Sequence, residues 1–190
     1  MQGRVYFYAI SAVLMWSTTA ALVKSLLTEI PTYEALFVSS LAGAFFLIVM
    51  QLVRGGGRVF RAYDVRGYAA MAGLGFLGIF LYSGLYYYGL SQLTSQEACI
   101  LNFLWPMMIV LFAAFLLGER ITVRTAAALL LSFSGVVVLT LGGEGHAEGN
   151  AVMGMIACVL AAVCYGLFCV LNKRRNLDQT VMMVVAWGVT

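Results

Sequence analysis

A proline, a tryptophan and an asparagine stand close together in a long apolar segment of this 190-residue sequence. Pro106 has no backbone N–H, so a helix that runs through it leaves the carbonyl group of Asn102, four residues earlier, without its usual partner. Such a group is tolerated inside a membrane only where protein groups or a water-filled cavity satisfy it. Asn102 and Trp105 also share one helical face. We therefore predict that they line a solute-binding cavity; the alternative is a kinked helix whose Asn102 side chain bonds to a neighbour.

Tyrosines follow a single stripe of the preceding apolar segment. The stripe has the spacing i, i+3, i+7, i+11 and i+14 and consists of Gly75, Gly78, Tyr82, Tyr86 and Gly89. Glycines on such a stripe let a neighbouring helix approach closely, and tyrosine rings between helices can stack on an apolar or aromatic solute. Tyr82 and Tyr86 are thus candidates either for binding or for helix packing. The same two readings apply to Tyr165 and Asn172, which lie at i and i+7 in a later segment.

The segments that must position these residues have the composition of membrane helices. Hydrophobic residues make up 63% of the chain, charged residues 10%, and the mean hydropathy is +0.96, far from the profile of a water-soluble domain. A helix needs about 20 apolar residues to cross a hydrocarbon core of roughly 30 Å. Six segments meet this length, at residues 5–27, 33–53, 67–90, 95–117, 123–141 and 150–172. We predict an all-α, polytopic membrane helical bundle in contact with the lipid bilayer.

The chain also contains a weak internal repeat. A shift of 149 residues superimposes four pairs of residues: Trp16 with Tyr165, Ser17 with Gly166, Lys24 with Lys173 and Glu29 with Asp178. Five segments separate the two copies, so the second copy enters the membrane from the opposite side, which is the inverted-repeat plan of many secondary transporters. Residues 1–149 are then a first five-helix repeat, and residues 150–190 are the start of a second. Its next segment begins near residue 179 and is too short to span, so we expect the chain to be part of a longer, ten-helix protein.

Basic residues determine the expected orientation, because short loops that carry Lys and Arg stay on the cytoplasmic side. Ten of the eleven fall on one side of the predicted helices: Arg4, Arg54, Arg58, Arg61, Arg66, Arg120, Arg124, Lys173, Arg174 and Arg175. The eleventh, Lys24, lies near the outer end of the first segment, where it can snorkel to the interface. We expect a bacterial inner-membrane protein with a cytoplasmic N-terminus. The basic residues form no phosphate-binding groove, which argues against nucleic acid as a partner.

Metal-binding and ionisable residues are too scattered for an enzyme or a metal site. The four cysteines fall within predicted helices without metal-ligand spacing and are interpreted as packing residues, and His146 lies in a glycine-rich loop. Glu119 stands beside Arg120 and Arg124, which favours a structural ion pair. No acid lies at mid-depth in a segment, so no coupling ion is indicated. We expect no enzyme activity, no metal and no cofactor.

The order of these short motifs resembles the drug/metabolite transporter superfamily, of the ten-helix EamA type. The resemblance rests on Trp16 with Lys24, Pro106, the Gly118 and Glu119 pair, and the stretch 135–141. Members often carry an arginine in the second helix, whereas this chain has Ser39 and Ser40. Together with the runs 16–18 and 102–106 and the pair 172–173, this departure makes the chain similar to the aromatic amino-acid exporters of the superfamily.

The resemblance implies a secondary transporter that exports amino acids, aromatic ones included, or similar small metabolites by alternating access around a central cavity. The candidate substrate-binding residues are Trp16, Tyr82, Tyr86, Asn102, Trp105, Tyr165 and Asn172. Two other interpretations stay open: a non-transporting membrane scaffold, and a multidrug or nucleotide-sugar carrier of the same fold. The sequence does not indicate an oligomeric state.

Overall fold

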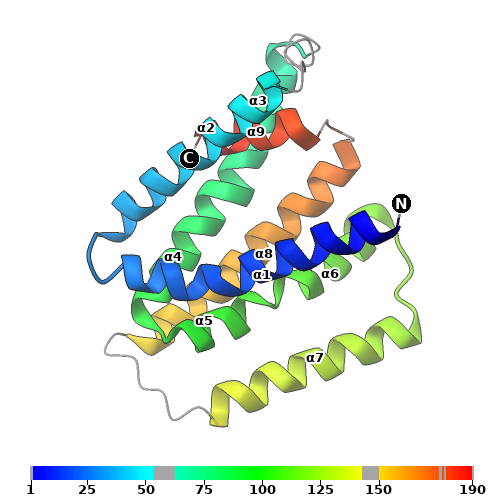
Figure 1. The fold of residues 1–190 in the computed structure, drawn as a ribbon. Helices are drawn as coiled ribbons and strands as arrows, with labels where there is room; N and C mark the ends of the chain where they lie inside the picture. Colours follow the sequence, from blue (N-terminus) through cyan, green and yellow to red (C-terminus); the bar gives the residue numbers. More distant parts are fainter. Residues whose placement is uncertain (1, 54–62, 143–149, 176, 178, 190) are drawn as a thin grey trace.

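Every element that the structure describes is a helix (Figure 1). The computed structural model describes residues 2–53, 63–142, 150–175, 177 and 179–189. In chain order the helices are α1 Gln2–Leu26, α2 Thr32–Val53, α3 Val65–Gly75, η2 Phe76–Leu81, α4 Tyr82–Gln92, α5 Ser95–Asn102, α6 Trp105–Leu117, α7 Val123–Gly142, α8 Ala151–Arg175 and α9 Gln179–Val189. The segments α3, η2 and α4 form one continuous rod, in which η2 is a π-helix.

The all-α membrane bundle predicted from hydropathy is confirmed. Within the described part of the chain, five helical segments are long and apolar enough to cross a membrane: Tyr6–Leu26, Thr32–Val53, Val65–Gln92, Ser95–Leu117 and Ala151–Arg175. The other predicted segment, 123–141, corresponds to α7, in which Val123–Gly135 is a shorter apolar helix by the same criteria. The chain is a multi-pass membrane protein.

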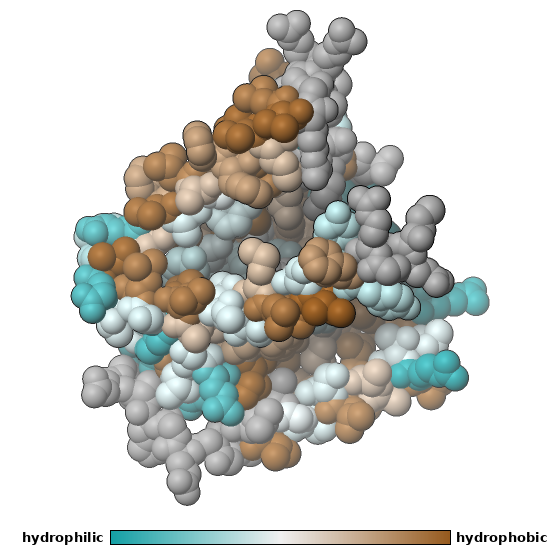
Figure 2. Space-filling model, in the orientation of Figure 1, coloured by the Kyte–Doolittle hydropathy of each residue, from teal (hydrophilic) through white to brown (hydrophobic). Residues whose placement is uncertain are grey.

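Large apolar side chains cover the outside of the bundle. Phe45, Phe46 and Phe115 are 68%, 66% and 83% exposed. Figure 2 shows brown hydrophobic residues across the visible face, with hydrophilic residues mainly at its margins. Such extensive apolar surface is unfavourable in water, whereas lipid tails are a suitable solvent for it. The surface therefore supports the same conclusion as the helix lengths.

Local capping sets several helix ends near the pocket described below. Thr94 and Glu97 form a capping box at the start of α5, so the chain turns back within two residues of the end of α4. Gly118 ends α6 with φ 70°, a left-handed conformation that glycine adopts without steric cost. The tight turn before α5 holds the tyrosine-bearing face of α4 beside the asparagine-bearing end of α5, which contacts it.

Helix α8 packs against α4, η2, α5 and α6 and forms the centre of the bundle. Gly78 and Gly89 lie directly against Phe168 and Cys158 of α8, leaving no room for a Cβ atom at either position. The close helix approach predicted from the glycine stripe is therefore confirmed. Helix α1 contacts α4 and α5 and runs opposite to α8, α9 packs on α2 and α3, and α7 contacts α5 while lying apart from most of the bundle (Figure 1).

Candidate functional site

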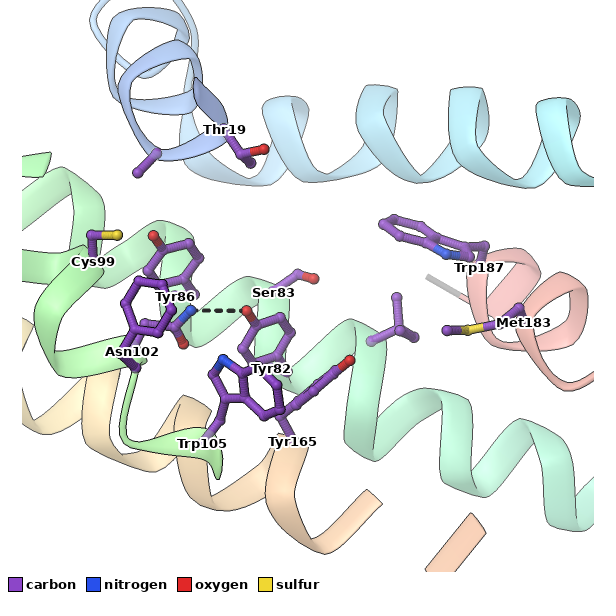
Figure 3. Close-up of a pocket in the computed structure, with 13 residues that line it drawn as sticks. Thr19, Tyr82, Ser83, Tyr86, Cys99, Asn102, Trp105, Tyr165, Met183 and Trp187 are labelled. Carbon is purple, nitrogen blue, oxygen red and sulfur yellow. Dashed lines mark hydrogen bonds between the residues drawn. The ribbon is translucent and has the colours of Figure 1, made fainter. Parts of the chain in front are cut away.

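A pocket of about 280 Å³ lies where α1, η2, α4, α5, α6, α8 and α9 converge (Figure 3). Its described lining residues are Thr19, Ala20, Ile79, Tyr82, Ser83, Tyr86, Cys99, Asn102, Phe103, Trp105, Tyr165, Met183 and Trp187. We name it the aromatic pocket, since six of these thirteen residues are aromatic. Its volume is close to the lower end of the range of roughly 300–1,000 Å³ that is typical of small-molecule sites. Five of the seven predicted substrate-binding residues line it: Tyr82, Tyr86, Asn102, Trp105 and Tyr165.

Three helices contribute the rings of the pocket wall. Tyr82 and Tyr86, one turn apart on α4, are stacked with centroids 6.0 Å apart and an interplanar angle of 9°. Tyr165 of α8 lies 4.9 Å from Tyr82, and Trp105 of α6 meets Tyr165 edge-on at 5.4 Å. Figure 3 shows these rings gathered on one side of the pocket, with Trp187 and Met183 of α9 across from them. The arrangement presents aromatic faces and edges on which a flat, apolar group can stack.

Asn102 supplies an amide group to this aromatic wall. Its Nδ2 donates a hydrogen bond to the hydroxyl oxygen of Tyr82 at 3.1 Å (Figure 3). Its Oδ1 is buried and has no hydrogen-bond partner within the described part of the chain. Buried polar atoms are nearly always paired in folded proteins, so the Oδ1 atom of Asn102 is a candidate acceptor for a donor on a solute or a water. The hydrogen bond to Tyr82 agrees with the second reading, in which the Asn102 side chain bonds to a neighbour, and its role in solute binding stays a prediction.

The predicted fourth span, Ser95–Leu117, is interrupted between Asn102 and Trp105. We predicted one helix through Pro106, but α5 ends at Asn102 and α6 begins at Trp105. Across the gap, the amide groups of Phe103 and Leu104 bond to carbonyl groups of the preceding turn. Pro106 then lies in the first turn of α6, where a missing N–H costs nothing. Asn102 and Trp105 therefore belong to different helices, although both line the aromatic pocket.

Helix α1 lines the pocket with residues that follow the predicted Trp16 in the sequence. Thr19 and Ala20 of α1 line it, one turn after Trp16. The side chain of Trp16 itself lies outside the described residues, so its predicted role stays a prediction.

Asn172, the remaining candidate, belongs to a second pocket at the end of α8. This pocket of about 370 Å³ is lined by Tyr165, Phe168, Cys169, Asn172, Lys173, Leu177 and Met183, and we name it the Lys173 pocket. Tyr165 and Met183 border both pockets. Tyr165 and Asn172 do share a helical face, as the spacing predicted, but seven residues place them about 10.5 Å apart along the helix axis. Both residues line this second pocket, and whether they bind a solute or only pack stays open.

An ion pair stands at the end of α8 where the Lys173 pocket lies. The Nζ atom of Lys173 is 2.7 Å from the Oε1 atom of Glu119, and the two side chains are 63% and 51% exposed. We expected Glu119 to pair with the neighbouring Arg120 or Arg124, and that expectation of the partner is wrong. The physical reason is tertiary: α6 packs along α8, so the residue just after α6 comes beside the last turn of α8.

Lys24 also differs from expectation. Instead of extending to the membrane interface, its Nζ donates to the carbonyl oxygens of Leu90 and Leu93 at 2.6 and 2.8 Å. These carbonyl groups lie at the end of α4, where the last carbonyl groups of a helix lack intrahelical partners and carry partial negative charge. Lys24 therefore fastens α1 to the end of α4.

Comparison with known proteins identifies the family. Residues 3–141 match the model of the EamA-like transporter family. The chain belongs to this family. It is 32% identical over 167 residues to the aromatic amino acid exporter YddG of Ancylobacter novellus, a match that covers 86% of this chain and 56% of that protein. It is 29% identical over 179 residues to the pseudopaline exporter CntI of Pseudomonas aeruginosa, covering 94% of this chain and 61% of that protein.

The fold agrees with a solved crystal structure of a protein that is 28% identical to this chain. The TM-score is 0.70, and the match covers 94% of this chain and 61% of the other. The chain thus spans between half and two thirds of the length of these relatives. Membership of the EamA-like transporter family makes the two pockets along α8 the candidate functional site of this chain.

Several lining residues of this member of the EamA-like transporter family were not predicted. Ser83 adjoins Tyr82, and Thr19 follows Trp16 by one turn, so helical spacing from a predicted residue would have found Thr19. Met183 and Trp187 lie at i and i+4 on α9 and carried no signal, because apolar residues at that spacing are typical of any packed helix. Cys99 and Cys169, which we interpreted as packing residues, line the aromatic pocket and the Lys173 pocket respectively.

Within the described ranges, no group of three or more His, Cys, Asp or Glu side chains is placed to hold a metal ion. His146 lies outside those ranges. The chemistry that the described site offers is therefore stacking, hydrogen bonding and, at the Lys173 pocket, charge.

Proposed function

We propose that the protein exports small organic solutes with an aromatic group, aromatic amino acids foremost, and binds them in the aromatic pocket. The observation that carries the proposal is the joint presence of the wall of Tyr82, Tyr165 and Trp105 and the buried, unpaired Oδ1 atom of Asn102. The rings suit an aromatic side chain. The amide oxygen accepts hydrogen bonds, which suits the α-ammonium group of an amino acid.

The family relationship supports the same class of solute. The exporter from A. novellus is named for aromatic amino acids, and the aromatic wall would bind such solutes more strongly than aliphatic ones. The pseudopaline exporter is a relative with another named cargo, so the identity of the solute has to come from the pocket and not from the family.

We place the N-terminus in the cytoplasm of a bacterium and the protein in its inner membrane. Ten of the eleven basic residues then face the cytoplasm, and the relatives reported above are bacterial exporters. In this orientation the Lys173 pocket opens toward the cytoplasm, and Lys24 lies toward the other side.

The proposed mechanism is alternating access between residues 1–149 and an inverted second repeat that begins at residue 150. The opposite directions of α1 and α8 in Figure 1 suit this plan, because corresponding helices of an inverted repeat enter the membrane from opposite sides. The aromatic pocket would then be the site around which the two repeats move.

The experiment that tests the function is solute transport by purified protein in liposomes. Radiolabelled tryptophan, phenylalanine, tyrosine, leucine and glutamate are each loaded on one side, with protein-free liposomes as the control. We expect saturable transport of the aromatic amino acids. Other aromatic amino acids should compete with this transport, and glutamate should not. Failure to move any of the five solutes would contradict the proposal, and equal rates for leucine and tryptophan would contradict the role of the aromatic wall.

A further inference from the structure

The two pockets that meet at Tyr165 have different chemistry. Among the described residues that line the aromatic pocket there is no Lys, Arg, Asp or Glu. The Lys173 pocket, by contrast, contains the ammonium group of Lys173. Tyr165 and Met183 stand between the two spaces, since they line both. A solute with a carboxylate that passes along α8 toward the aromatic pocket therefore meets a cation before it meets the rings.

The ammonium group of Lys173 is available for exchange. Its partner is the carboxylate of Glu119, and both side chains are more than half exposed. Exposed ion pairs contribute little to stability, so another carboxylate can replace that of Glu119 at little cost. Lys24 differs in this respect, because its ammonium group is half-buried and bound to two backbone carbonyl groups.

We infer that the Lys173 pocket is a second solute-binding site, at which Lys173 binds the carboxylate of an amino acid on its way to the aromatic pocket. This inference rests on the proposed function and orientation. When no solute is bound, the carboxylate of Glu119 pairs with the ammonium group of Lys173. It competes with the carboxylate of the solute for that group. Tyr165 lies next to the solute's side chain in this site and also forms part of the aromatic wall, so the ring of the solute remains in contact with it during the transfer.

The inference gives the two partners of the ion pair opposite effects. Lys173→Gln removes the cation and weakens carboxylate binding. Glu119→Gln removes the competitor and strengthens it. An ion pair with only a structural role behaves differently, because either substitution breaks the same contact and both then change transport in the same direction.

The test measures the apparent KM for tryptophan at the cytoplasmic face of purified protein in liposomes, beside that for tryptophanamide, which lacks the carboxylate. We expect Lys173→Gln to raise the KM for tryptophan about tenfold, as the loss of one charge-assisted hydrogen bond implies, and to change that for the amide less than about twofold. Glu119→Gln should lower the KM for tryptophan, and Lys173→Arg should retain most of the wild-type affinity. Arg174→Gln is the matched control, because Arg174 is an exposed cation on the same helix turn that does not line the pocket.

A second measurement does not depend on transport. Cys169 lines the Lys173 pocket, so the difference in thiol labelling between wild type and Cys169→Ala reports on this site. An anionic methanethiosulfonate should label Cys169 faster than a cationic one, and Lys173→Gln should abolish that preference. Tryptophan should protect Cys169 in the wild type and lose this protection in Lys173→Gln.

Three results would overturn the inference: KM changes of the same sign for Lys173→Gln and Glu119→Gln, an equal effect of Arg174→Gln, or equal sensitivity of the amide. Protection of Cys169 that depends on Lys173, without any transport of amino acids, would instead contradict the proposed function and leave the binding site standing. If the wild type shows neither protection of Cys169 by tryptophan nor transport of amino acids, both the inference and the proposed function are contradicted.

Discussion

Because the Oδ1 atom of Asn102 is unpaired, a single substitution at this residue can distinguish its effect on solute binding from its effect on stability. Asn102→Leu keeps the approximate size of the side chain and removes its polar atoms. The substitution loses the hydrogen bond to Tyr82, which contributes about 0.5–1.5 kcal/mol, but it also removes a buried acceptor whose missing partner costs about 1–3 kcal/mol. These contributions oppose each other, so the free energy of unfolding should change by between about −0.5 and +2.5 kcal/mol.

Solute binding, in contrast, should weaken with the same substitution. If Oδ1 accepts a hydrogen bond from the ammonium group of the solute, its loss removes a bond to a charged group, worth about 1.5–3 kcal/mol. That energy corresponds to a roughly 10- to 150-fold higher Kd. The assays are thermal unfolding in detergent and titration with tryptophan or phenylalanine by calorimetry.

Tyr82→Phe is the matched control for Asn102→Leu. It removes the hydroxyl group that holds Nδ2 but retains the ring and the Oδ1 atom, so it should lower stability by about 1 kcal/mol and weaken binding less than Asn102→Leu does. An unchanged Kd in Asn102→Leu would refute the reasoning about Oδ1. A parallel fall of stability and affinity would show that Asn102 only supports Tyr82.

Four further substitutions, one of them a control, test other parts of the site and the helices that hold it. Trp105→Ala should raise the KM for aromatic solutes roughly tenfold or more, because a wall ring is lost, while membrane insertion, checked by the amount of folded protein, stays unchanged. Lys24→Met should lower the free energy of unfolding by about 1–3 kcal/mol, since it leaves carbonyl groups at the end of α4 unpaired; thermal unfolding measures this. Gly78→Val should cost about 1–3 kcal/mol by overpacking against Phe168, whereas Gly73→Ala, with open space around it, should leave the melting temperature unchanged or slightly raised.

The helices could be predicted from sequence because lipid leaves the backbone few alternatives. Each backbone polar group in the hydrocarbon core has to be paired within the chain, so an apolar segment of sufficient length becomes a helix. Helical periodicity then decides which residues share a face, and for this reason the stripe of Gly78, Tyr82 and Tyr86 emerged as predicted. The aromatic wall could be anticipated to the extent that it follows from such local spacing.

Contacts between distant segments could not be predicted in the same way. The partner of Glu119 is 54 residues away in sequence, and no local pattern distinguishes Lys173 from the nearer Arg120. Helical spacing also defines a face but not a depth in the membrane, which explains why Asn172 lies in a different pocket from Tyr82. The stop of α5 at Asn102 depends on how the next two residues are bonded, and a proline alone is compatible with either a kink or a break.

The proposed inverted repeat relates Lys24 to Lys173. The two lysines make different contacts at the two ends of the helix bundle. Lys24 ties α1 to the terminal carbonyl groups of α4 in a half-buried contact at one end of the bundle. Lys173 lies at the opposite end in an exposed ion pair beside an open pocket. Under alternating access, corresponding parts of the two repeats exchange their environments as one end closes and the other opens. In the proposed mechanism, the unequal contacts of the two lysines would correspond to a state in which the Lys173 end is open.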